Sequence, residues 1–302
     1  MPVYLMGLSR GREFFLDRYR MLGQGLTGDE STPQAIRVNS LKIRDAELLE
    51  VMSSIGVELE KLPFLDHGYR VIRTEFSLGS TIEYLLGLYS LQEAASQLPV
   101  QVLWPEPGDV ALDMCSAPGG KTTQMAAFMG NRGRLYAVDS SRERLYAVEN
   151  SLERCGVTNC LVYHGDAAEI ELGLIFQKIL LDAPCSGNYV TDSLWFSRRT
   201  LKDVEINAEH QRSLMSRALE LLEPGGWLLY STCSLEPEEN ELNVQWLLEN
   251  HAVELSPVDG PGHPGLTDVF GVELDPSLSR CKRLWPDDAG TQGFFVAKVV
   301  KR

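Results

Sequence analysis

Two cysteines follow apolar runs that are typical of buried strands, and a thiol at the end of a strand is placed to act as a nucleophile. Cys185 lies in KILLDAPCSG (178–187), and Cys233 lies in LLYSTCS (228–234). A cysteine thiolate forms covalent intermediates with electrophilic carbon when the thiol is accessible. Asp182 precedes Cys185 by three residues, so we expect an acid beside this thiol. The residues alone leave open which of the two thiols attacks.

A glycine-containing turn, ALDMCSAPGGKTT, follows one predicted strand and opens a predicted helix. Its two glycines allow a ligand to approach the backbone closely, and the helix N-terminus presents unpaired N–H groups. The turn has neither the G-x-G-x-x-G nor the P-loop pattern, so it lacks a phosphate cradle. Asp139, at the next strand end, is placed to accept from ribose hydroxyls, and Asp166 from an adenine amino group. We predict S-adenosylmethionine as cofactor; the alternative is that the glycines only permit tight packing and the acids are solvated.

The elements that position these residues alternate in type from about residue 90 onward. Short apolar segments such as RLYAVD, KILLDAP and WLLYSTCS are separated by amphipathic helical segments, which is typical of a doubly wound, mostly parallel sheet. Ligands of such folds bind at the carboxyl ends of the strands. We expect an α/β, Rossmann-like domain over residues 76–302 and a small α+β module over residues 1–75. The Gly/Pro-rich segment 256–292 is predicted to be a surface excursion.

Basic and aromatic residues interleave near the N-terminus. The net charge of −14 disfavours a polyanionic partner. The excess of acid lies in residues 75–302, with 18 Lys/Arg against 32 Asp/Glu, whereas residues 1–74 carry ten of each. We therefore expect the module to contact nucleic-acid phosphates, with a protein partner that supplies basic surface as the alternative. The residues predicted to make these contacts are Arg10, Arg12, Arg18, Arg20 and Arg37.

Composition also argues against several classes of protein. The six cysteines include no Cys-x-x-Cys and the histidines form no ligand-spaced pair, so we expect no metal. No stretch approaches the ~18–20 apolar residues of a membrane span. The start MPVYLMGLSRGREFF reaches Arg10 and Arg12 before a signal-peptide core forms. We expect a soluble, cytoplasmic and monomeric protein whose thiols are reduced.

Three segments together resemble the signature blocks of the RNA cytosine-5 methyltransferases of the Nop/Sun type: DMCSAPGGKTTQMA, DAPCSG and YSTCSLEPEENE. IRVNSLKI, YSLQEAAS and GTQGFFVAKVV resemble flanking blocks of that family in the same order. The resemblance implies an S-adenosylmethionine-dependent class I methyltransferase with a seven-stranded sheet behind an amino-terminal RNA-binding module. The cofactor contacts that it implies are Cys115, Ser116, Ala117, Pro118, Gly119, Gly120, Lys121, Asp139, Arg144, Asp166 and Asp182.

Methylation of cytosine at carbon 5 needs covalent activation of the ring. A thiolate that adds to carbon 6 makes carbon 5 nucleophilic, an acid contacts ring nitrogen 3, and a base later removes the carbon 5 proton. Asp182 is our candidate for the acid. The resemblance assigns attack to Cys233 and product release to Cys185, whereas the Pro-Cys context that DNA cytosine enzymes share nominates Cys185. The target base must be flipped out or single-stranded.

The sequence thus predicts an RNA cytosine-5 methyltransferase, with tRNA favoured over rRNA as substrate. One alternative is a DNA cytosine or other base methyltransferase, which leaves Cys233 in its Ser-Thr-Cys context unexplained. The other is a non-catalytic RNA-binding or ribosome-assembly factor that keeps the fold. The presence of Asp182, Cys185 and Cys233 together argues against that second alternative.

Overall fold

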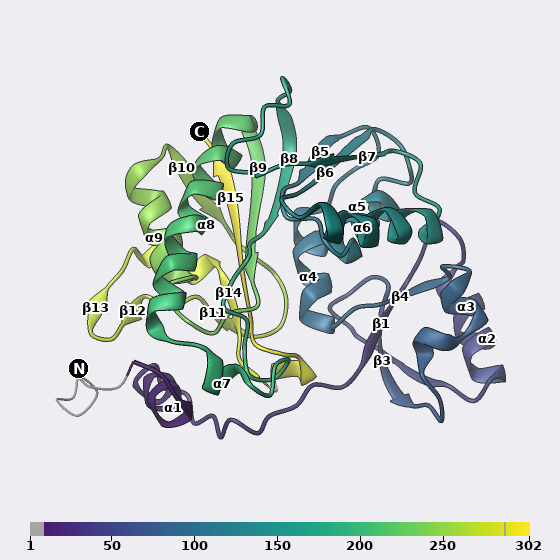
Figure 1. Ribbon diagram of the computed structural model, residues 1–302, viewed down its shortest axis with the longest axis horizontal. Coiled ribbons are helices and arrows are strands. Elements are labelled where there is room, and N and C mark those ends of the chain that lie inside the picture. Colours follow the sequence, from purple (N-terminus) through teal and green to yellow (C-terminus); the bar gives the residue numbers. More distant parts are fainter. Residues whose placement is uncertain (1–8, 287) are drawn as a thin grey trace.

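The computed structural model describes residues 9–286 and 288–302, which form two unequal lobes (Figure 1). The larger lobe is a mixed β-sheet with helices on both faces, and the smaller lobe is a four-stranded antiparallel sheet with short helices. The expectation that no signal peptide is present concerns residues 1–15, of which the first eight lie outside the described residues. Within the described ranges, we find no helix with the length and apolar character needed to cross a membrane.

The larger sheet has nine strands within the described residues, in the order β11-β14-β15-β9-β8-β5-β6-β7, with β10 paired to β15. Neighbouring strands from β7 to β9 are parallel, whereas β15 is antiparallel to β9. This arrangement confirms the predicted doubly wound α/β fold. The strands are β5 (Val110–Asp113), β6 (Arg134–Asp139), β7 (Cys160–His164), β8 (Phe176–Asp182), β9 (Leu222–Thr232), β10 (Val253–Ser256), β11 (His263–Pro264), β14 (Lys282–Leu284) and β15 (Phe294–Lys301).

The predicted surface excursion over residues 256–292 contributes β11 and β14 to this sheet, and β10 ends where the excursion begins. The described sheet therefore has more strands than the seven that were predicted. Strands of two or three residues carry too little alternation to be recognised in a sequence. Within the same excursion, β12 (Asp268–Val269) and β13 (Val272–Glu273) pair only with each other.

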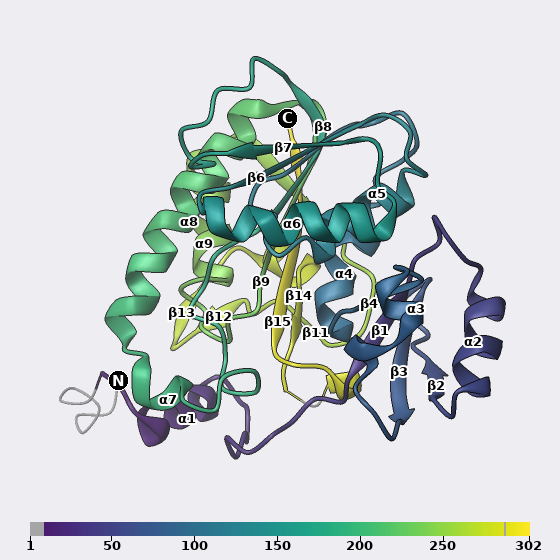
Figure 2. The ribbon, with the colours of Figure 1, turned by 45° about the vertical axis from the view of Figure 1, so that its right-hand side comes forward.

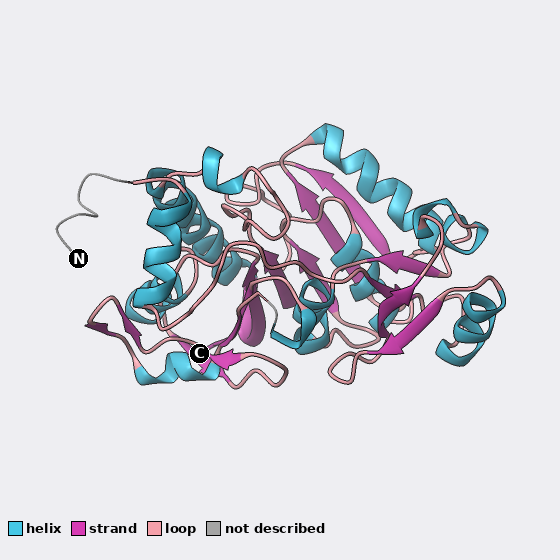
Figure 3. Cartoon of the chain, turned by 90° about the horizontal axis from the view of Figure 1, so that it is seen from below, coloured by secondary structure: helices cyan, strands magenta, loops and turns pink. Residues whose placement is uncertain are grey.

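Two apolar cores flank the sheet because successive strand side chains point to opposite faces. Ile179 and Leu181 of β8 belong to one core, and Leu180 belongs to the other. A parallel strand that is covered on both faces has no solvent-facing side, so its residues are apolar on both faces. This explains the continuous apolar run within KILLDA. Figures 2 and 3 show the helices on the two sides of the strands. The first core contains α8 (Leu201–Leu221) and α9 (Glu241–Asn250), the second contains α4 (Ala94–Leu103) and α5 (Gly120–Phe128), and α6 (Arg142–Cys155) packs on β6.

The smaller lobe differs from the module predicted over residues 1–75 at both ends. Its sheet has the order β2-β3-β1-β4, so residues 89–91 complete it, and the first helix belongs to the larger lobe. Sequence pattern missed this because β4 is only three residues long. The elements are β1 (Ala35–Val38), β2 (Glu58–Lys61), β3 (Gly68–Arg73), β4 (Tyr89–Leu91), α2 (Asp45–Ser54) and α3 (Ile82–Leu85).

Arg37 of β1 joins the smaller lobe to α5. Its side chain is 2% exposed and donates hydrogen bonds to Gln92 Oε1 at 2.5 Å, to the Gly120 carbonyl at 2.7 Å and to Thr123 Oγ1 at 2.9 Å. A guanidinium enclosed in this way has no surface to offer a phosphate. The prediction that Arg37 contacts RNA is therefore corrected.

The first helix, α1 (Arg12–Met21), packs on the larger lobe (Figure 1). Phe15 lies edge-on to Trp195 at a ring-centroid distance of 4.5 Å. Trp195 begins α7 (Trp195–Arg198), so α1 closes over the loop that follows β8. The aromatic residues that sequence analysis placed beside the N-terminal arginines therefore build an apolar contact within the larger lobe.

Arg18 of α1 is also buried, with 1% of its surface exposed. Its guanidinium donates to Glu236 Oε2 at 3.0 Å and to Glu238 Oε1 at 2.7 Å, in the loop after β9. Burial alone lowers the pKa of Arg18, but the two carboxylates raise it above its ordinary value. The prediction that Arg18 contacts RNA is corrected, because its donors serve this buried ion-pair network.

We predict that Arg18→Ala lowers the free energy of unfolding by about 3–5 kcal/mol, because it leaves the buried Glu236 without its cation. Urea unfolding followed by circular dichroism measures this loss. Arg20→Ala is the matched control on the same helix, since Arg20 is half exposed and pairs with Asp17 near the surface. We expect that control to change stability by less than about 1 kcal/mol. Equal losses in the two variants would contradict the role given to Arg18.

Candidate active site

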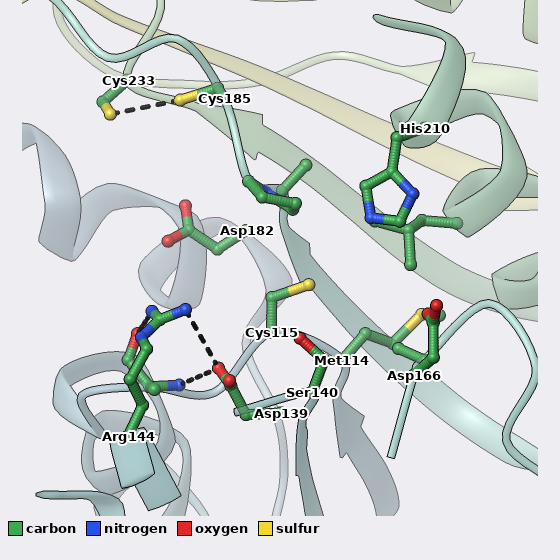
Figure 4. Close-up of a pocket in the computed structure, with 15 residues that line it drawn as sticks. Met114, Cys115, Asp139, Ser140, Arg144, Asp166, Asp182, Cys185, His210 and Cys233 are labelled. Carbon is green, nitrogen blue, oxygen red and sulfur yellow. Dashed lines mark hydrogen bonds and ion pairs between the residues drawn. The ribbon is translucent and has the colours of Figure 1, made fainter. Parts of the chain in front are cut away.

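A cavity of about 250 Å³ opens at the carboxyl ends of the parallel strands, where the fold predicts a ligand. Figure 4 shows Asp139 and Arg144 at one end, Cys185 and Cys233 at the other, and Asp182 between them. The residues that line the cavity are Met114, Cys115, Ala117, Asp139, Ser140, Arg144, Asp166, Ala167, Asp182, Ala183, Pro184, Cys185, His210, Leu214 and Cys233.

The turn between β5 and α5 forms one wall of this cavity. Gly119 caps α5 with φ of +101°, and a Cβ there would lie 2.9 Å from Ser151 Cβ, so a side chain is excluded by both backbone and space. Asp113, at the end of β5, accepts from Thr122 Oγ1 at 2.7 Å, and burial raises its pKa to about 7. The buried Asp113 thus fixes the start of α5, and Gly119 lets the turn pack closely against α6.

Asp139, at the end of β6, is held as an acceptor and is only 4% exposed. Its carboxylate receives the Ala117 N–H at 3.2 Å and the Ser141 N–H at 3.0 Å. Arg144 lies 3.6 Å from the same carboxylate and donates to the Ala117 carbonyl at 2.9 Å. Asp139 therefore ties the glycine-containing turn to the start of α6.

The donors and acceptors of this end of the cavity fit S-adenosylmethionine. The Asp139 carboxylate is held at a strand end by two backbone N–H groups. In folds of this type, an acid at this place accepts hydrogen bonds from ribose hydroxyls. In an adjoining hollow, Ser116 Oγ is buried and has no hydrogen-bond partner among the described residues, as expected where a polar group of a ligand completes the turn. Asp166 lines the cavity of Figure 4, near Met114.

Asp182, at the end of β8, lies between the glycine-containing turn and the thiols. It accepts from Lys121 Nζ at 2.7 Å and from Ser231 Oγ at 2.8 Å. Lys121 also donates to Ser96 Oγ at 2.8 Å, so its ammonium is fixed between α4 and the carboxylate. The acid that sequence analysis placed beside Cys185 is thus oriented from two sides.

The two thiols lie at the ends of adjacent strands, with Cys185 Sγ and Cys233 Sγ 3.3 Å apart. The hydrogen bond to Cys233, together with burial, raises the pKa of Cys185 well above its ordinary value. Either sulfur can donate to the other at this distance, so the geometry brings the two thiols together and leaves open which of them attacks.

The residues predicted to bind the cofactor divide between two adjoining hollows. Cys115, Ala117, Asp139, Arg144 and Asp166 line the cavity of Figure 4, whereas Gly119 packs against α6. The second hollow adjoins the smaller lobe and shares Cys115, Ala117 and Asp182 with the first. It is lined by Leu91, Gln92, Glu93, Ser96, Cys115, Ser116, Ala117, Pro118, Gly120, Lys121 and Asp182.

Several residues of the site were not predicted from the sequence pattern. His210 and Leu214 on α8 line the cavity, and their spacing of four residues along one helix face is a signal that the sequence carried. Ser96 and Ser231, which hold Lys121 and Asp182, gave no signal of their own. In the part of the chain that the structure describes, no group of three or more His, Cys, Asp or Glu residues is arranged to hold a metal ion.

Three of the five arginines that were predicted to contact RNA are exposed. Arg10 forms an isolated bridge with Thr200, Arg12 pairs with Asp29 at 2.6 Å, and Arg20 pairs with Asp17. All three residues are exposed, and the bridge places the Arg10 backbone beside the start of α8. Arg18 and Arg37 are excluded from this set by the burial described above.

Two protein-family models match consecutive parts of the chain. Residues 13–94 match the N-terminal domain of 16S rRNA methyltransferase RsmF, and residues 100–300 match 16S rRNA methyltransferase RsmB/F. The boundary between them lies in α4, close to the junction of the two lobes.

Curated relatives are similar along most of this chain. The 26S rRNA (cytosine-C(5))-methyltransferase nsun-1 of Caenorhabditis elegans is 39% identical over 99% of this chain and 46% of its own length. Ribosomal RNA small subunit methyltransferase F of Klebsiella pneumoniae is 39% identical over 89% of this chain and 57% of its own length. The chain thus spans about half the length of these relatives.

Solved structures show the same fold. A methyltransferase homologue protein from Pyrococcus horikoshii has a TM-score of 0.88 and 41% identity, over 96% of this chain and 95% of that one. The structure of NSun6 from Pyrococcus horikoshii with SFG has a TM-score of 0.81 and 27% identity, over 99% and 96% of the two chains. The match of residues 100–300, which covers the whole parallel sheet and both thiols, shows that the chain belongs to the RsmB/F methyltransferase family.

Proposed function

We propose that this protein methylates carbon 5 of cytosine in RNA through a covalent cysteine adduct. The observation that carries the proposal is the pair of thiols, 3.3 Å apart, at one end of a cavity whose other end presents Asp139. The activity named for the curated relatives, rRNA cytosine-C(5) methylation, supports it. A DNA cytosine enzyme does not account for Cys233, and a non-catalytic factor does not account for two thiols that face one cavity.

S-adenosylmethionine is the cofactor of this proposal, and it supplies an activated methyl group on a sulfonium. Membership of a methyltransferase family supports this assignment. Asp139 would accept from the ribose hydroxyls and Asp166 from the adenine amino group. The turn from Cys115 to Lys121 would approach the cofactor with its backbone, as its glycines permit.

The chain's own residues divide the chemistry. The Cys233 thiolate forms a bond to carbon 6 of cytosine, and the electron pair of the 5,6 double bond makes carbon 5 nucleophilic. Asp182, fixed by Lys121 and Ser231, contacts ring nitrogen 3. After methylation, a base takes the carbon 5 proton, the electron pair of that C–H bond re-forms the 5,6 double bond, and Cys233 leaves carbon 6 as a thiolate. Cys185 has its part in this release step.

The class of RNA is the finer part of the proposal. The preference for tRNA over rRNA stays a prediction, whereas the relatives are named for rRNA. Bisulfite sequencing of total RNA from cells with and without the protein distinguishes the two, because it reports the substrate and the position together. If no cytosine in RNA or in DNA loses its methylation when the protein is absent, the proposal is contradicted.

The division between the thiols predicts two different variants. Cys233→Ala should abolish both methyl transfer and covalent capture of RNA that contains 5-fluorocytosine, because no bond to carbon 6 forms. Cys185→Ala should attack but release slowly, so a denaturation-resistant complex with ordinary RNA accumulates. Gel electrophoresis under denaturing conditions detects both covalent complexes, and transfer of a labelled methyl group measures the activity. A complex that appears in Cys233→Ala and not in Cys185→Ala would reverse the two roles.

The cofactor assignment predicts that Asp139→Ala weakens S-adenosylmethionine binding by about 1–3 kcal/mol, because ribose hydroxyls lose their acceptor. Isothermal titration calorimetry measures this change. Asp192→Ala, at a partly exposed acid of the loop before α7, is the control and should bind the cofactor like the original protein. An unchanged dissociation constant in Asp139→Ala would remove Asp139 from the cofactor site.

The exposed N-terminal arginines predict a change in the salt dependence of RNA affinity. If Arg10, Arg12 and Arg20 contact phosphates, their joint neutralisation should reduce the slope of log K against log salt by up to about 2 units. Filter binding over a salt series measures the slope, and cofactor affinity should not move. Arg302→Ala, at the far end of the sheet in Figure 1, is the control. An unaltered slope would mean that other residues or a partner hold the RNA.

A further inference from the structure

The residues that directly follow the two thiols contact each other. Ser186 follows Cys185, Ser234 follows Cys233, and their hydroxyl oxygens are 3.1 Å apart. Both serines are at most 1% exposed. The loop after β8 and the loop after β9 are therefore joined at the positions next to the reacting sulfurs.

Glu239 lies beneath this contact and fixes it. Its carboxylate accepts the Ser186 N–H at 2.8 Å, the Ser186 hydroxyl at 2.5 Å and the Gln211 amide at 3.2 Å. The side chain is fully buried, and burial raises its pKa although the hydrogen bonds act in the opposite direction. A carboxylate enclosed in this way is costly unless donors surround it, so its donors are held in place.

A second link between the loops runs beside the first. Asn188, in the loop of Cys185, donates to the Cys233 carbonyl at 2.8 Å and to the Gly293 carbonyl at 3.2 Å. Asn240 donates to the Ser234 carbonyl at 2.9 Å, so the loop of Cys233 is also held from its other side. Each thiol thus stands on a backbone that is hydrogen-bonded to the other loop.

We propose that Glu239, acting through Ser186 and Ser234, is a positioning residue that sets the distance between the Cys185 and Cys233 sulfurs. None of the three side chains lines the cavity of Figure 4, so they act through the two thiols and not on the base. The consequence for catalysis rests on the proposed function: a displaced Cys185 fails at product release, while Cys233 still attacks.

Phenylarsine oxide is a probe of the distance between the sulfurs that needs neither RNA nor cofactor. Its arsenic forms bonds to two neighbouring thiols, and its oxygen leaves with the two thiol protons as water, without oxidation or reduction. The second bond forms within the molecule, so the affinity depends on the effective concentration of one thiol near the other. If Cys185→Ala and Cys233→Ala each lose tight binding of phenylarsine oxide, these two thiols are the ones that bind the arsenic together.

We expect Ser234→Ala and Glu239→Gln each to weaken phenylarsine oxide binding by about tenfold, because the sulfurs are no longer held together. Ser186→Ala combined with Ser234→Ala should weaken it little more than either change alone, because each already breaks the same link. The exposed Ser213→Ala and Glu249→Gln are the matched controls and should bind normally. Thermal unfolding checks that each variant is folded; if Glu239→Gln unfolds, the milder Ser234→Ala decides.

Single-turnover reaction with RNA supplies the second measurement. Ser234→Ala should retain capture of RNA containing 5-fluorocytosine and accumulate the covalent complex with ordinary RNA, as Cys185→Ala does. Normal arsenical affinity in folded Ser234→Ala and Glu239→Gln overturns the inference, and so do fully additive effects in the double variant. A third result is that the unsubstituted protein transfers no methyl group while the variants still bind the arsenical more weakly. That result would overturn the proposed function and leave the positioning of the thiols intact.

Discussion

The parallel pairing of β8 with β9 is the constraint on which the site depends. Its register sets Asp182 opposite Ser231, and the Ala183 N–H continues the ladder to the Ser231 carbonyl at 2.9 Å. Because the two strands leave the sheet at the same level, Cys185 and Cys233 emerge at one edge. A slip of one residue would turn Asp182 to the opposite face of the sheet. Register therefore decides whether acid and thiols share a cavity.

The segment from the end of β9 to the first residue of α9 contains three buried acids. Glu236, Glu239 and Glu241 are all fully buried, and each is met by donors from a different part of the chain. Arg18 reaches Glu236 from α1, and Arg283 donates to Glu241 Oε1 at 2.7 Å from β14. The segment EPEENE thus holds the N-terminal helix, the first thiol loop and an added strand around the second thiol.

Buried acids also change what the charge of the chain means. Burial raises the pKa of Asp113 and of Glu236 to about 7, and it raises that of Glu239. Burial thus shifts these acids toward their protonated forms, in the direction that reduces the formal charge of −14. The sequence could not supply this correction, because the pKa of an acid depends on its enclosure.

Local pattern predicted the features that are local in the chain. The strand ends, the glycine-containing turn and the residues Asp139, Asp182 and Cys233 follow from apolar runs and what succeeds them. The roles of the arginines could not be predicted this way. Arg18 meets Glu236 across 218 residues of sequence, and only the packing of α1 on the larger lobe brings the two together.

The smaller lobe is held by the same two helices, α5 and α6, that pack beside the glycine-containing turn. Arg37 donates to the Gly120 carbonyl, and Asn39 donates to the Cys155 carbonyl at the end of α6. Arg154, also of α6, donates to the Tyr84 and Tyr89 carbonyls of the smaller lobe. Asp139 ties the turn before α5 to the start of α6. The contacts of these two helices therefore fix both the orientation of the smaller lobe and the shape of this end of the cavity.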